Sequence, residues 1–175
     1  MNPAHLHLVV NHLPILGTLF GILILITGMV LRNPMVKRTA LGLLVFSAGF
    51  AVLAFTTGEG AEEVVEGLPG ISEATIGRHE DLADLFLGAS IILGAISLLT
   101  FVSDLLSWKP SQALYVLTLA AAVGTMVLAQ QTGTSGGEIR HTEIRASVVN
   151  GEAGTNGAET GGTTMESGES EGDDD

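Results

Sequence analysis

The stretch 13–31, LPILGTLFGILILITGMVL, decides the fold, because it contains no charged residue. A helix of ~20 apolar residues spans the hydrocarbon core of a bilayer. Three further uncharged runs follow, at residues 39–58, 85–103 and 110–137. A soluble protein has no use for four such runs. The sequence therefore predicts an all-α fold, an integral membrane four-helix bundle.

The predicted membrane domain covers residues 1–146, and its spans are placed at about 8–31, 38–57, 84–106 and 111–131. No Lys or Arg precedes the first span, and Arg32 follows it, which is the reverse of a cleaved signal peptide. We therefore expect a retained span. Asn33-Pro34 is a turn signal after it, and Ser72 is expected to cap a long helix that continues through the third span.

The formal net charge of −12 coexists with a mean hydropathy of +0.47 because the charges are segregated along the chain. Residues 147–175 are dominated by Gly, Glu, Thr, Ser and Asp, and they contain too little apolar surface to offset chain entropy. A disordered acidic C-terminal tail is predicted there. The acidic charge disfavours nucleic-acid binding, and the absence of cysteine excludes disulfides and thiolate metal sites.

The positive residues predict the orientation of the bundle. The two short connections, 32–38 and 104–110, hold four of the seven Lys and Arg residues. The positive-inside rule then places both short loops in the cytoplasm. Both termini and the acidic segment 59–84 are predicted to be external, or periplasmic, in a bacterial inner (cytoplasmic) membrane.

All five histidines fall on this predicted external side. His12 and His79 lie near the starts of spans one and three, which run in the same direction, so we expect their side chains to meet across the bundle. The segment after the fourth span is expected to fold back and bring His141 over them. The sequence therefore predicts cofactor binding by His12, His79 and His141.

Carboxylates crowd the same region and extend the set of possible ligands. Imidazole with carboxylate suits a transition-metal ion such as Zn, Fe, Mn or Cu, whereas two imidazoles from facing helices suit haem b. The candidate metal ligands are His5, His7, Glu59, Glu62, Glu63 and Glu80. An interpretation without a cofactor stays open, because histidine is ordinary at a headgroup boundary and acidic residues stabilise helix N-termini.

Three local patterns carry further expectations. Asn11 precedes a helical run and is a candidate N-cap. The steps Gly17-x-x-x-Gly21 and Ala120-x-x-x-Gly124 predict close helix packing. Residues 136–145, GGEIRHTEIR, alternate strongly, which predicts a short β segment over the mouth of the bundle, with arginines able to pair with the nearby carboxylates.

Four motifs in this order resemble an uncharacterised family of bacterial four-helix membrane proteins. They are HLHLVVNHLPILG (5–17), TGEGAEEVVEGLPG (57–70), RHEDLADLF (78–86) and GGEIRHTEIR (136–145). The resemblance covers residues 1–146 and implies the four-helix fold, without an established activity. Some relatives lie beside cytochrome-like domains, which points by association to haem.

Two functions are therefore weighed. The first is a membrane protein that binds haem b or a metal ion through external histidines and serves in electron transfer. The second is a non-enzymatic accessory or structural subunit, with other membrane or respiratory subunits as partners beside the lipid bilayer. A transporter is disfavoured because no charge lies at the middle of a span. No phosphate loop or dinucleotide fingerprint occurs, which favours a non-enzymatic role.

Overall fold

A computed structural model describes residues 2–108 and 112–145 of the chain. The described part is helical and contains no strand. Its elements are α1 (Pro3–Val10), α2 (His12–Val30), α3 (Pro34–Thr56), α4 (Gly58–Val65), α5 (Glu73–Leu105), α6 (Gln112–Arg140) and a turn of 3-10 helix, η1 (Thr142–Ile144). The chain divides after His141, so the bundle and η1 are separate units. The predicted disordered tail, 147–175, lies outside the described residues.

Four helical segments are long and apolar enough to cross a membrane, which confirms the predicted number of spans. They are Pro3–Val30, Pro34–Val65, Glu73–Leu105 and Gln112–Arg140. This is the architecture of a multi-pass membrane protein. At 1.5 Å per residue, the 33-residue α5 is ~50 Å long and exceeds the ~30 Å hydrocarbon core. Apart from Asp104, the charged residues of α5 all lie between Glu73 and Asp84, so the first turns are the part of the helix expected to extend beyond such a layer.

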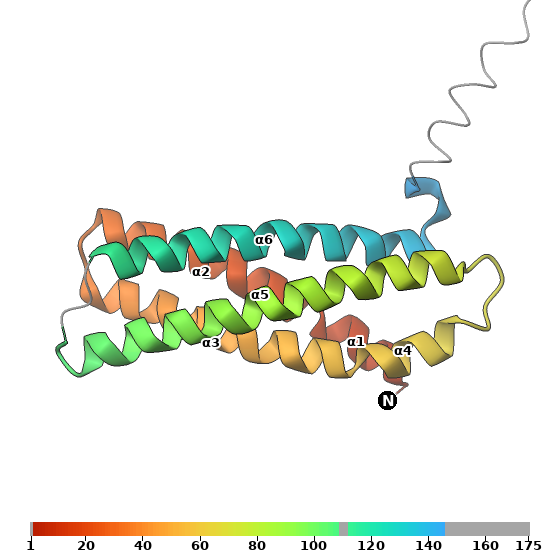
Figure 1. Cartoon of the computed structure of the whole chain (residues 1–175), viewed down its shortest axis with the longest axis horizontal. Helices are drawn as coiled ribbons and strands as arrows, with labels where there is room; N and C mark the ends of the chain where they lie inside the picture. The colour runs from red at the N-terminus through yellow and green to blue at the C-terminus, as the bar shows by residue number, and fades with distance from the viewer. Residues whose placement is uncertain (1, 109–111, 146–175) are drawn as a thin grey trace, which may run out of the picture. The chain divides into compact units, whose positions relative to one another are not determined.

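The long helices run antiparallel to their neighbours in the chain, and contacts join α2 to α3, α3 to α5, α5 to α6 and α6 back to α2 (Figure 1). The two short helices α1 and α4 pack against each other. One end of the bundle, here called the acidic end, consists of α1, α4, the first turns of α5 and the last turns of α6. The opposite end, here called the short-loop end, holds the connections after α2 and after α5.

Proline explains why the first segment is two helices. Pro14 has no N–H to bond the carbonyl of Val10, and its ring crowds that carbonyl. The helix breaks at Asn11, between α1 and α2. Asn11 occupies the N-cap position, but its side chain makes no capping bond and its buried Oδ1 has no partner among the described residues. Asn11 therefore lies at the predicted N-cap position, but the prediction that its side chain caps the helix is wrong.

The other helix boundaries follow the predicted turn chemistry. Asn33 caps α3, and its Oδ1 accepts hydrogen bonds from the backbone N–H groups of Met35 (2.9 Å) and Val36 (3.3 Å). Pro34 stands at the first helical position, where its missing N–H costs nothing. Ser72 is the N-cap residue of α5, as predicted, although its side chain makes no capping bond.

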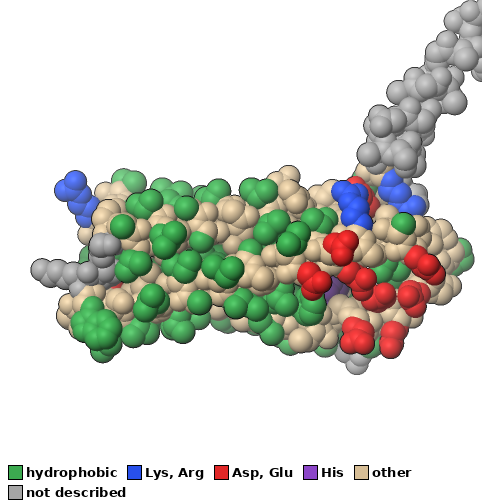
Figure 2. Space-filling model, in the orientation of Figure 1, with side chains coloured by type: hydrophobic (Ala, Val, Ile, Leu, Met, Phe, Trp, Pro, Cys, Tyr) green, Lys and Arg blue, Asp and Glu red, His purple; other side chains and the backbone are tan. Residues whose placement is uncertain are grey.

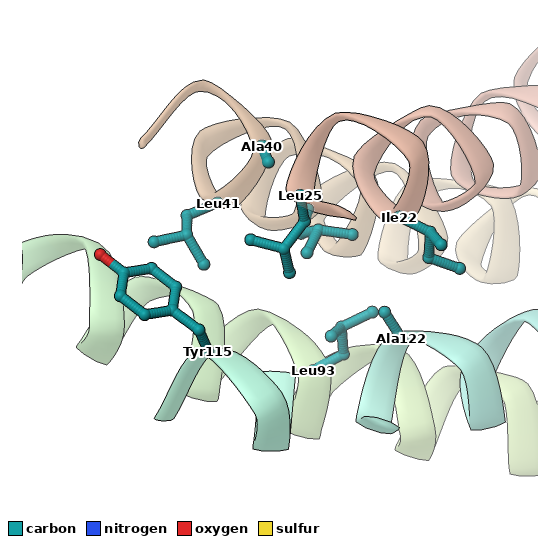
Figure 3. Packing of buried hydrophobic residues seen from close by; sticks show 8 residues of the cluster. Ile22, Leu25, Ala40, Leu41, Leu93, Tyr115 and Ala122 are labelled. Carbon is teal, nitrogen blue, oxygen red and sulfur yellow. The ribbon is translucent and has the colours of Figure 1, made fainter. Parts of the chain in front are cut away.

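The core of the bundle combines aliphatic side chains with hydroxyls. Figure 3 shows Leu25, Leu41 and Leu93 meeting between the helices. Buried hydroxyls lie beside this cluster; Thr18 and Ser47 share a hydrogen bond of 2.8 Å, and Ser47 also donates to the carbonyl of Pro14. Large apolar side chains are exposed along the outer faces, as expected where lipid replaces water.

Only one of the two small-residue steps packs inside the chain. A Cβ at Gly17 or Gly21 would lie 3.0 Å from Ser47 or 2.4 Å from Leu44, so these glycines let α2 approach α3 closely. A Cβ at Gly124 would meet nothing within 4 Å, and Ala120 is exposed. The prediction that the second step packs within the bundle is wrong.

The predicted β segment is also wrong. Residues 136–140 continue α6, which runs to Arg140, and η1 follows. The alternation in GGEIRHTEIR favours a strand, but the helix α6 is already formed where this segment begins. Extending a formed helix adds one hydrogen bond for each residue, so the helix continues.

Candidate functional site

The acidic end gathers most of the charged side chains of the bundle. Figure 2 shows acidic side chains over the end that holds α4, while hydrophobic side chains cover the face between the two ends. Seven of the predicted site residues lie on three elements here: His5 and His7 on α1, Glu59, Glu62 and Glu63 on α4, and His79 and Glu80 on α5.

His7 is half-buried between α1 and the end of α3. Its Nδ1–H donates to the carbonyl oxygen of Ala54 at 3.0 Å, and the hydroxyl of Thr57 lies 3.2 Å from the same nitrogen. The same carbonyl oxygen also accepts from the hydroxyl of Thr57 (2.8 Å) and from its backbone N–H (3.3 Å), in the turn that ends α3. The Thr57-Gly58 step is therefore the docking point of the His7 ring, whose Cε1 lies 3.8 Å from a Cβ built on Gly58.

His79 is held in the same way between α5 and α6. Its Nδ1–H donates to the carbonyl oxygen of Thr132 at 3.1 Å, and the hydroxyl of Ser135 lies 3.0 Å away. A Cβ on Gly136 would lie 3.0 Å from Cε1 of the ring, so glycine there leaves room for the imidazole.

Both rings therefore have a defined tautomer. A carbonyl oxygen can only accept, so the proton is on Nδ1 and the lone pair is on Nε2. This is the arrangement that orients metal-ligating imidazoles, in which the second nitrogen is tied to a carbonyl. Neither Nε2 makes a hydrogen bond within the described part of the chain.

The two histidines are electrostatic neighbours. Both lie outside the spans predicted from the sequence, 8–31 and 84–106, in the end turns of the longer apolar segments Pro3–Val30 and Glu73–Leu105. Burial lowers the pKa of His79 below its ordinary value of 6.5, and the charge of His7 lowers it further. Burial also lowers the pKa of His7. The lowered pKa values favour the neutral form of both rings, which is the form that binds metals.

Two carboxylates from different helices, Glu62 on α4 and Glu80 on α5, also meet at the acidic end. A hydrogen bond with Glu80 raises the pKa of Glu62, and burial and the charges of nearby glutamates raise it further. Among residues 2–108 and 112–145, however, no group of three His, Asp or Glu side chains is close enough to hold a metal ion. The metal set predicted from His5, His7 and the glutamates is not assembled here.

The remaining predicted ligands are placed differently. His12 is exposed, and its Nδ1–H donates to the carbonyl of Leu8 in its own segment at 2.9 Å. His5, Glu59 and Glu63 are exposed as well. His141 is exposed directly after α6, and its backbone N–H donates to the carbonyl of Gly137. In the structure the histidine that acts electrostatically on His79 is therefore His7. The sequence had predicted His12 in this place.

Two ion pairs were not predicted. At the acidic end, Arg78 pairs with Glu138 at 2.6 Å and joins α5 to α6. At the short-loop end, Arg38 pairs with Asp104, whose carboxylate also accepts from the hydroxyl of Tyr115. The signal for the second pair was present in the sequence, because Asp104 is the only acidic residue in either short connection.

Ser135 raises a catalytic alternative, because residues 133–137 have the G-x-S-x-G spacing of a serine nucleophile. That motif acts on a strained turn between a strand and a helix. Here Ser135 lies inside α6, is 1% exposed and donates to the carbonyl of Thr132 at 2.9 Å. Its hydroxyl is therefore a structural partner of the His79 ring.

The comparisons add no family to this description. No protein-family model, no curated protein and no solved structure matches the chain.

Proposed function

We propose that this multi-pass membrane protein binds a metal centre through Nε2 of His7 and Nε2 of His79, and that the centre serves electron transfer. The observation that carries the proposal is the shared geometry of the two rings. Each Nδ1–H is fixed by a carbonyl and a hydroxyl of a neighbouring helix, at 3.0–3.2 Å, while each Nε2 is left for a ligand. A surface histidine without a ligand does not need hydrogen bonds that fix the orientation of its ring, whereas a metal-binding histidine usually has them.

The number of protein donors favours haem b over a bare ion. A zinc, manganese or non-haem iron ion takes three or more protein ligands, whereas haem iron takes only two axial ligands because the macrocycle supplies the others. His7 is carried by α1, the short helix that the break at Asn11 separates from α2.

The test uses the purified full-length chain. Haem binding predicts a Soret band and about one iron per chain, whereas a bare ion predicts stoichiometric metal without that band. His7→Ala and His79→Ala should each lose the centre, and His12→Ala is the matched control that should keep it. A chain that holds neither haem nor metal after supplementation during growth refutes the proposal.

The orientation belongs to the same proposal. We place both termini and the acidic end outside the cell, and both short loops in the cytoplasm of a bacterial inner membrane. The support is the excess of Lys and Arg in the short loops. Reporter fusions after Pro34 and Lys109 should read cytoplasmic, and a fusion after Gly70 should read external. A cytoplasmic reading at Gly70 would reverse the orientation.

We also propose that the chain is related to the uncharacterised four-helix family. The support is the presence of four of its motifs in the same order along the chain.

A second candidate, an accessory subunit, has its own observation. Built Cβ atoms on Gly42, Gly49, Gly88 and Gly124 meet nothing within 4 Å, so these helix glycines face outward or lie in open space. Glycine on an outer face permits close approach by a helix of another membrane protein. Extraction in mild detergent followed by native mass spectrometry tests this role. A defined heteromeric mass without any metal centre would favour it over electron transfer.

A further inference from the structure

A shallow groove runs between α5 and α6 at the acidic end, and neither His7 nor His79 is among the residues that line it. Its volume is about 500 Å³, which is within the usual range of small-molecule sites. The residues that line it are Arg78, Asp81, Leu82, Val127, Gln130, Gln131 and Thr134. Binding in this groove does not depend on His7 or His79.

The groove crosses the predicted edge of the membrane. Two cross-helix bonds fix its register: the hydroxyl of Thr132 donates to the carbonyl of Leu82 at 3.0 Å, and Arg78 pairs with Glu138 further out. Val127, one turn deeper than Gln131 on α6, is thus on the apolar side of the predicted span end at 131. Arg78 is on the watery side. From the inner to the outer end of the groove, the lining side chains are first apolar, then amides and then charged. A phospholipid has the same order of groups, with its acyl chain inside, its ester in the middle and its head group outside.

The charges select the head group. The Arg78 side chain is 60% exposed, and one of its nitrogens is engaged by Glu138. A guanidinium has five N–H donors, so others remain for a phosphate. Asp81 is exposed in the same groove. With Arg78, Asp81 and Glu138 the local formal charge is −1, which disfavours a purely anionic head group and favours one that adds a cation.

We propose that the α5–α6 groove binds an ethanolamine phospholipid, with its phosphate on Arg78, its primary ammonium on Asp81 and the start of an acyl chain along Val127. The amides of Gln130 and Gln131 lie at the level of the phosphate and ester oxygens. An ammonium offers three N–H donors to a carboxylate, whereas a choline group offers none. The groove should therefore distinguish ethanolamine from choline head groups.

Native mass spectrometry of the full-length chain in detergent tests the selectivity. The probes are ethanolamine, choline and glycerol phospholipids with identical acyl chains. We expect the ethanolamine lipid to bind roughly two- to fivefold more tightly than the choline lipid, because an ion pair at an exposed site contributes about that much. The glycerol lipid should bind least. Equal binding of the three, or preference for the glycerol lipid, would overturn the proposal.

A pair of substitutions locates the site. Asp81→Asn should lower binding of the ethanolamine lipid to the level of the choline lipid and leave the choline lipid unchanged. Asp84→Asn, an exposed carboxylate one turn along α5 and outside the groove lining, should change neither. Both positions are exposed, so both variants should fold, which circular dichroism verifies. If Asp81→Asn and Asp84→Asn behave alike, the groove is not the site.

Discussion

The approach of α3 to α5 at Gly94 is tight enough to give a quantitative prediction. A Cβ on Gly94 would lie 2.6 Å from the Cβ of Ala48. Carbon atoms in contact prefer about 3.5–4.0 Å, so Gly94→Ala must part the helices by about 1 Å. Both carbons are bonded directly to backbone, and no side-chain rotation relieves the contact. Overpacking of this kind costs about 1–3 kcal/mol, and we expect that loss in the free energy of unfolding.

Gly88→Ala is the matched control in the same helix. A Cβ on Gly88 meets nothing within 4 Å, and alanine is a better helix former than glycine by up to about 1 kcal/mol. This variant should be as stable as the parent or slightly more so. The assay is reversible unfolding in mixed micelles, followed by the helical circular dichroism signal. Equal stabilities for Gly94→Ala and Gly88→Ala would refute the packing of α3 against α5.

Three further outcomes are expected. Because the folded-state pKa of His79 is lowered below 6.5 by burial and by His7, its contribution to stability is present above pH 6.5 and is lost as pH falls through the lowered value. Thermal melts should show a smaller loss between pH 7.5 and 5 for His79→Gln than for the parent; an unchanged pH profile would contradict this. Arg38→Gln and Asp104→Asn should each destabilise by roughly 1–3 kcal/mol and should be non-additive in a double-mutant cycle, whereas additivity would mean that the ion pair contributes nothing. Truncation after Ala146 should leave the melting temperature in detergent unchanged, and a marked loss would reveal packing by the tail.

The spans were predictable because their signal is long and redundant. Four uncharged runs identify helices whatever the details of packing, and Asn33-Pro34 and Ser72 mark boundaries through local chemistry alone. The β interpretation of 136–145 was wrong because alternation in a short segment says nothing of the helix that precedes it. Periodicity is a local signal, whereas continuation of α6 depends on a helix that already exists.

The site was only partly predictable for a related reason. The predicted topology placed all five histidines at one end of the bundle. Which histidine ring lies near His79 depends, however, on the helix break at Asn11. That break places α1 against α4 and turns His7 toward the end of α3. The sequence favoured His12 because it lies near the start of the predicted first span, which was placed at 8–31 without a break. Similarly, the bond from His79 to Thr132 needs the register of α5 against α6, and no local pattern encodes it.

The shared role of His7 and His79 is tested most directly by one titration series across four proteins. Metal or haem binding is measured for the parent, His7→Ala, His79→Ala and the double variant. If one centre is held by both imidazoles, each single substitution should abolish binding as fully as the double one, since groups that act as a unit are not additive. Half-occupancy in each single variant, or full occupancy in the double variant, would contradict a centre shared by the two histidines.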